Sequence, residues 1–256
     1  MASRKKSNLD TSADGGGEAE SGPVEPRGPF ASWLFLLVGL IAGGLAIPAG
    51  KIATTEFADP LPEEFFELVD AKPSALSDEL RQQANAILEK NQDTNHGRFL
   101  MALGATMAVT FGWGAGFIHG RILFGIIAAF LGAAVAIGIG MFAPRLILDL
   151  QKTAADMQEH RDFYSMSVYA SQWLLFGVPV AFAVSIAAGR VTTFIKSAGI
   201  VFMAAILGSV VYVIFGTLLD RSLPLTAATP FDGPTGYLWA CAAPVLMGLF
   251  MARTRL

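Results

Sequence analysis

Residues 103–141 read LGATMAVTFGWGAGFIHGRILFGIIAAFLGAAVAIGIGM, a largely apolar stretch interrupted by His119-Gly120-Arg121. Small residues recur at every fourth position on both sides of this interruption. They are Gly104, Ala108, Gly112, Gly116 and Gly120 in the first arm, and Ala128, Gly132, Ala136 and Gly140 in the second. A spacing of four keeps residues on one slowly drifting face of a helix, and small residues let two helices approach closely inside lipid. The stretch therefore predicts a helical hairpin packed through this small-residue ladder.

The composition of the whole chain is that of a membrane protein. Of 256 residues, 53% are hydrophobic and 15% charged, and the mean hydropathy is +0.52. Soluble domains carry about 25% charged residues. The net charge of −3 and the scattered basic residues give no sign of a nucleic-acid partner. Cys241 is the single cysteine, which excludes a disulfide within the chain.

The hydropathy pattern predicts an all-α, polytopic membrane bundle of about six transmembrane helices, with two amphipathic helices outside the membrane. The expected spans are residues 30–49, 99–118, 122–143, 166–188, 197–219 and 237–252. We interpret the first span as a retained signal-anchor, with a cleaved signal peptide as the alternative. Tyr237 and Trp239 are expected at the membrane interface, where aromatic residues form belts.

The hydrophilic segments lie outside these spans. Residues 1–28 are too polar to bury a core and are expected to be a disordered tail. In the region 50–98 we expect a short helix at 63–70 and an amphipathic helix at 74–91, with Gly97 as a stop. Pro144 is expected to end the third span, and an amphipathic helix is expected at 145–162. Its apolar face consists of Leu146, Leu150, Ala154 and Met157. These amphipathic faces dock either on the protein's own bundle or on a protein partner; the pattern alone favours neither.

An even number of spans places both termini on the same side of the membrane. Lys and Arg divide equally between the two sides, but the loops on the terminal side are far shorter and hence denser in positive charge. Because basic loops stay inside, we expect cytoplasmic termini in a plasma or inner cell membrane.

The fourth expected span repeats the ladder with Gly177, Ala181, Ser185 and Gly189. A shift of 69 residues places Gly120-Arg121 on Gly189-Arg190 and aligns the two ladders. Few other positions are identical, so a duplicated hairpin is a hypothesis, motivated by the parallel repeats of transporter folds. For the ladders themselves, helix packing is the favoured interpretation, with a hinge or narrow pore as the alternative.

Motifs that would carry chemistry are weak in this chain. No Asp, Glu or Lys falls near the middle of a span, where ion pumps and proton-coupled carriers need such a group. Asp156, Glu159 and His160 would share one face of a helix, but no second cluster completes a metal site. We therefore expect no enzyme, cofactor or metal, and we interpret these three side chains as a solvated face.

Two functional hypotheses follow. The first is a non-enzymatic scaffold or accessory subunit that contacts the lipid bilayer and, through residues 50–98 and 145–162, a protein partner. The second is a small transporter or channel built from two related glycine-rich hairpins.

Overall fold

A computed structural model of the chain describes residues 29–70, 78–156, 161–219, 233–254 and 256. Within these ranges the chain forms helices and no strand. The helices are α1 Pro29–Thr55, α2 Glu63–Asp70, α3 Asp78–Ile118, α4 Ile122–Asp156, α5 Arg161–Ala188, α6 Val191–Leu219 and α7 Gly233–Thr254. All except the short α2 are long and apolar enough to cross a membrane. The predicted fold class, an all-α bundle with six such helices, is confirmed.

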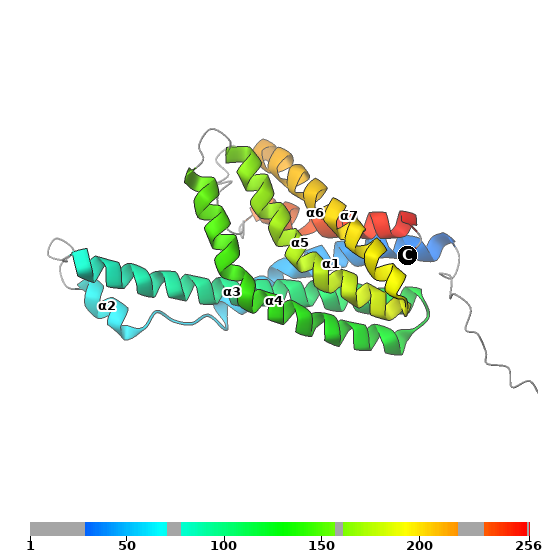
Figure 1. Ribbon diagram of the computed structural model, residues 1–256, viewed down its shortest axis with the longest axis horizontal. Helices are drawn as coiled ribbons and strands as arrows, with labels where there is room; N and C mark the ends of the chain where they lie inside the picture. Colours follow the sequence, from blue (N-terminus) through cyan, green and yellow to red (C-terminus); the bar gives the residue numbers. More distant parts are fainter. Residues whose placement is uncertain (1–28, 71–77, 157–160, 220–232, 255) are drawn as a thin grey trace, which may run out of the picture.

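The six long helices form a closed ring of neighbours (Figure 1). In order around the ring, α1 packs on α3, α3 on α4, α4 on α5, α5 on α6, α6 on α7, and α7 returns to α1. Helix α3 also contacts α5 across the ring. Because α1 and α7 are antiparallel, with Gly248 beside Phe35 and Cys241 beside Gly43, the start of α1 and the end of α7 lie at the same end of the bundle. We call this the terminal end; the opposite end holds α2 and the start of α3.

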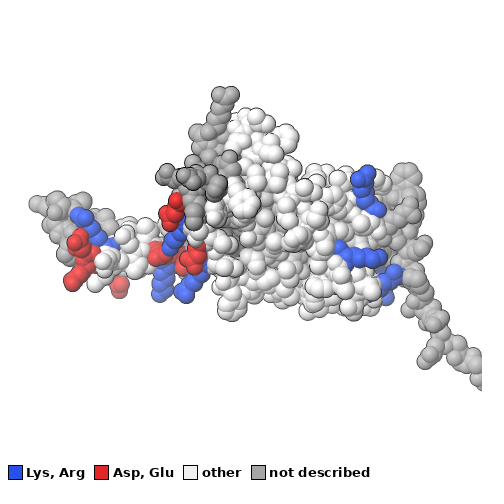
Figure 2. All heavy atoms as spheres, turned by 45° about the horizontal axis from the view of Figure 1, so that its top comes forward, with Lys and Arg blue, Asp and Glu red and all other residues white. Residues whose placement is uncertain are grey.

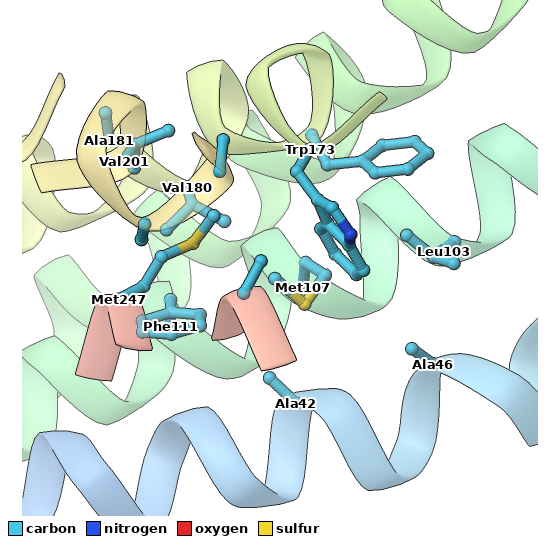
Figure 3. Close-up of a cluster of buried hydrophobic side chains, with 14 of the residues drawn as sticks. Ala42, Ala46, Leu103, Met107, Phe111, Trp173, Val180, Ala181, Val201 and Met247 are labelled. Atoms are coloured by element: carbon cyan, nitrogen blue, oxygen red, sulfur yellow. The ribbon is translucent and has the colours of Figure 1, made fainter. Parts of the chain in front are cut away.

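Apolar side chains from all six long helices fill the interior of the bundle, and Figure 3 shows part of this core. Leu103, Met107 and Phe111 of α3 lie fully buried, together with Val180 of α5 and Met247 of α7. Outward-facing positions are apolar as well, as a lipid-facing wall requires. The exposed side chains include Leu123, Phe130, Phe142, Ile195 and Phe202.

Two predicted helix ends are wrong, and they contact each other. Helix α3 continues through Gly97 and α4 continues through Pro144. A Cβ placed on Gly97 would lie 3.2 Å from Cγ of Pro144 and 3.3 Å from the carbonyl oxygen of Gly140. Pro144 has no N–H that could donate a hydrogen bond to the Gly140 carbonyl, one helical turn earlier. Gly97 therefore serves as a close-packing position against the proline turn of α4 and does not end a helix.

The predicted separate helix at 145–162 is also wrong. Its first part is the continuation of α4 to Asp156, and Arg161 already belongs to α5. The apolar face differs too, because Leu146 and Leu150 are exposed while Ile147 is fully buried. This part of α4 turns away from α3 in Figure 1, so the face that meets the bundle rotates relative to the expected one. Met157, Glu159 and His160 lie outside the described residues.

Candidate functional site

The two arms of the first ladder face each other, residue by residue, across α3 and α4. A Cβ on Gly104 would lie 3.1 Å from Cβ of Ala136, and one on Gly112 would lie 2.9 Å from the backbone nitrogen of Ala129, next to Ala128. Gly116 approaches the backbone of Gly125 in the same way, and Gly140 approaches Met101. The two members of each close pair lie at the same distance in sequence from Gly120, to within one residue. The small residues of the ladder therefore lie at the positions where α3 and α4 of the hairpin approach each other most closely.

Gly132 lies where the first hairpin meets the second. A Cβ on this residue would lie 3.0 Å from Cβ of Ala108 on α3 and 2.9 Å from Cβ of Ala183 on α5. It would also lie 3.3 Å from the carbonyl oxygen of Pro179. Three helices thus converge on a position that has room for hydrogen only.

The two Gly-Arg turns have the same hydrogen-bonded cap. After α3, the N–H of Arg121 donates to the Gly116 carbonyl at 2.7 Å and the N–H of Gly120 donates to Phe117 at 3.1 Å. After α5, Arg190 donates to Ser185 at 3.3 Å and Gly189 donates to Ile186 at 3.0 Å. This is the Schellman pattern, whose capping residue needs a positive φ. Gly120 and Gly189 have φ of 67° and 71°, so these two ladder glycines end helices at exposed turns.

The α5–α6 hairpin also has a close pair at the same distance from its turn. Gly177 packs against the side chain of Val201, each twelve positions from Gly189. Their counterparts in the first hairpin are Ala108 and Gly132, which are also in contact. Ala181 is buried between these levels, and the Ser185 hydroxyl donates to the Arg190 carbonyl at 3.3 Å. The two hairpins therefore share both turn and register, the features on which the duplication hypothesis depends.

Arg121 joins the two turns. Its Nη1 donates to the Ala188 carbonyl at 3.0 Å, at the carbonyl end of α5, and its guanidinium lies 4.6 Å from the Phe124 ring centre. Beside it, His119 is 5% exposed and packs edge-on against Phe35. Burial, and then the positive charges of Arg190 and Arg121, lower the pKa of His119. A neutral imidazole and a helix-capping arginine thus hold the first hairpin against α1 and α5.

At the opposite end, a strap of residues 57–59 is bound to α3. The N–H of Asp59 donates to Oδ1 of Asn95 at 2.9 Å, and Nδ2 of Asn91 donates to the Asp59 carbonyl at 2.9 Å. Arg98 adds an ion pair to Asp59 at 2.6 Å and a hydrogen bond to the Phe57 carbonyl. Sequence reasoning missed this strap, although Asn91, Asn95 and Arg98 recur at helical spacing on one face, a signal that could have found it.

The strap, α2 and residues 78–98 of α3 form an arm that projects from the bundle (Figure 1). Two ion pairs connect it to the second half of α4: Lys152 with Glu89, and Arg145 with Asp93 at 3.7 Å. A groove of about 550 Å³ runs along the arm, lined by Glu64 and Glu67 of α2 and by Gln83, Ala86 and Ile87 of α3. Phe57 and Phe66, exposed by 66% and 52%, add apolar surface to the arm.

Charge is segregated between the two ends of the bundle (Figure 2). The acidic side chains that the structure describes lie just after α1, on the arm and on the second half of α4, mixed with basic ones. The charged side chains described at the terminal end are all basic: Arg121, Arg190, Lys196 and Arg253. The apolar belt between the two ends matches the profile of a bundle that crosses a bilayer.

An aromatic cluster connects α3, α5, α6 and α7 near the arm. The ring centres of Trp173 and Trp239 lie 5.0 Å apart, and those of Phe99 and Trp239 lie 6.3 Å apart. Tyr169 and Tyr212 meet edge to face at 4.9 Å. Trp239 is 1% exposed, so its predicted place in an interfacial belt is wrong, whereas Tyr237 is 51% exposed. The indole packs inward because aromatic rings of α3 and α5, those of Phe99 and Trp173, lie against it.

No metal centre is formed by the residues that the structure describes. Asp156 is an exposed side chain at the end of α4, and its two predicted partners fall in the undescribed segment 157–160. Comparisons with protein families, with curated proteins and with solved structures gave no match to this chain. Its function therefore has to be inferred from its own residues.

Proposed function

We propose that this chain is a non-enzymatic integral membrane protein, a scaffold or accessory subunit, whose arm binds a protein partner outside the membrane. The observation that carries the proposal is the arm itself. A bundle that only needed to pack its own spans would gain nothing from a 41-residue helix whose first half lies beyond them. The arm carries a groove and, apart from it, the exposed side chains of Phe57 and Phe66, which offer apolar surface that a partner would cover.

The ion pairs and the strap support this proposal physically. They hold the arm in one orientation before any partner arrives, which lowers the ordering cost of binding. Exposed ion pairs contribute little stability, so their role here is positional. The second half of α4 belongs to the same surface, because Lys152 and Arg145 bind the arm directly.

The orientation belongs to the proposal as well. We place the termini in the cytoplasm because the terminal end carries only basic side chains among its described charges. The arm then faces the outside of a plasma or inner cell membrane, and the partner is an extracytoplasmic protein or domain.

Site-directed photocrosslinking in native membranes tests the proposal. A photoreactive residue at Phe66, an exposed apolar position of α2 on the arm, is expected to yield a discrete adduct with a partner protein. The same residue at Asn85, an exposed position on the opposite face of α3, is the matched control and should not yield that adduct. Ile87→Glu and Leu80→Glu should abolish the Phe66 adduct. Identical adducts from both positions, unaffected by Ile87→Glu, would contradict a binding role for the arm.

The alternative is a small transporter or channel, and the shared register of the two hairpins is the observation that favours it. Such a protein needs a hydrated path, whereas apolar side chains fill the interior at mid-span. Cysteines at Met107 or Ala181, introduced into a Cys241→Ser background, distinguish the two proposals. Reaction with a membrane-impermeant thiol reagent would favour transport, and protection of both would favour the scaffold.

A further inference from the structure

A groove of about 720 Å³ opens between α6 and α7 at the terminal end, away from the arm. It is lined by Lys196, Gly199, Ile200 and Met203 of α6 and by Phe250, Arg253 and Thr254 of α7. Both helices are long and apolar enough to cross a membrane, so we infer that the groove lies in the outer wall of the bundle, where lipid would be the surrounding solvent.

The lining changes from charged to apolar with depth. Helix α6 runs away from the terminal end and α7 runs toward it, so Lys196 and Arg253 lie at the mouth. Met203 and Phe250 lie deeper, with Met203 about 10 Å along α6 from Lys196 at the helical rise per residue. The groove is thus basic at its mouth and apolar along its length, which is the polarity of an anionic amphiphile.

Among the residues that the structure describes, no Asp or Glu lies at the end of the bundle that holds Lys196 and Arg253. Lys196 and Arg253 are exposed, and in the described part of the terminal end every charged side chain is basic. A phosphodiester between the two would be attracted by both, and by the field of Arg190 and Arg121 on the same end. Basic pockets between transmembrane helices bind lipid headgroups through this chemistry.

We propose that this groove binds one anionic phospholipid, with its phosphodiester between Lys196 and Arg253 and an acyl chain along Met203 and Phe250. Charge complementarity at the mouth selects a lipid with net negative charge over a zwitterionic one. The apolar wall requires an acyl chain and so excludes free phosphate as the ligand. This site is independent of the arm and of any protein partner there.

Native mass spectrometry of the full chain in detergent, with phosphatidylglycerol and phosphatidylcholine as competing probes, tests the charge selection. The unmodified protein should retain phosphatidylglycerol preferentially. Each cation removed should lower that preference about fivefold, since a basic residue at an anionic membrane surface contributes about 1 kcal/mol. Lys196→Gln/Arg253→Gln is the test variant, and Arg81→Gln/Lys90→Gln on the arm removes the same charge as a control. An equal loss of the preference for phosphatidylglycerol in both double variants would refute the proposed site.

A second pair of variants tests the groove without changing any charge. A Cβ at Gly199 meets nothing within 4 Å, so Gly199→Leu should fill the groove and leave the fold intact. Gly138 of α4 has equally open surroundings, and Gly138→Leu is the matched control. Retention of phosphatidylglycerol should fall in Gly199→Leu only. Glycerol phosphate, the headgroup without acyl chains, should not displace the lipid. Undiminished retention in Gly199→Leu, or displacement by glycerol phosphate, would refute the proposal.

Discussion

Gly132 offers the sharpest test of how this bundle is held together. Gly132→Ala adds one methyl group at the point where α3, α4 and α5 converge. That methyl would lie 2.9 Å from Cβ of Ala183 and 3.0 Å from Cβ of Ala108, closer than ordinary carbon contacts. Both alanines are fully buried, so neither can turn away, and the helices must separate.

The expected magnitude follows from the cost of overpacking, about 1–3 kcal/mol for an added group in a well-packed interior. Gly138→Ala is the control on the same helix, because its Cβ meets nothing within 4 Å. Both substitutions share the intrinsic gain of replacing glycine within a helix, at most about 1 kcal/mol. The difference between the two variants therefore isolates packing, and Gly132→Ala should be the less stable by about 1–3 kcal/mol.

The measurement is reversible unfolding of the purified chain in bicelles, with the free energy of unfolding compared among variants. A double-mutant cycle with Ala183→Gly makes the test specific, because removing the Ala183 methyl group should relieve part of the clash. Gly132→Ala/Ala183→Gly should then be more stable than the sum of the single changes allows. Equal stability of the Gly132→Ala and Gly138→Ala variants, or strict additivity in the cycle, would refute the proposed three-helix contact.

Two further predictions concern the terminal end. Gly189→Ala should lower the midpoint of thermal unfolding, because an L side chain at φ 71° costs about 1–2 kcal/mol and its Cβ would meet the Arg121 guanidinium. Gly199→Ala is the control and should leave the midpoint unchanged, because its surroundings are open. Equal effects of the two substitutions would argue against the shared turn. Burial lowers the pKa of His119 below its ordinary value of 6.5. The buried neutral ring therefore contributes stability above about pH 6.5. That stability is lost as the pH falls below this value, because the unfolded chain takes up a proton at His119 more readily than the folded chain does. Between about pH 7.5 and 5.5 the unfolding free energy of His119→Phe should therefore fall less than that of the unmodified protein, and parallel curves would contradict a buried neutral His119.

The sequence alone determined the membrane class, the number of spans and the hairpin. Lipid imposes long apolar helices, and these are visible in composition and length without any knowledge of neighbours. The ladder also marked the face through which the hairpin packs, because small residues at a spacing of four let another backbone approach closely within lipid. The repeated Gly-Arg pair likewise indicated two turns, since a Schellman cap needs glycine at a particular position.

Tertiary structure decided where the helices end and which faces are buried. Gly97 and Pro144 are helix breakers in isolation, yet Gly97 leaves space for the proline turn of α4 to pack closely, and both helices continue. Trp239 is a belt residue by its position in the span, but Phe99 and Trp173 provide the surroundings that draw it inward. The strap and the groove between Lys196 and Arg253 join residues more than thirty positions apart in sequence. Such sites depend on which helices become neighbours, and periodicity along one helix carries no information about that.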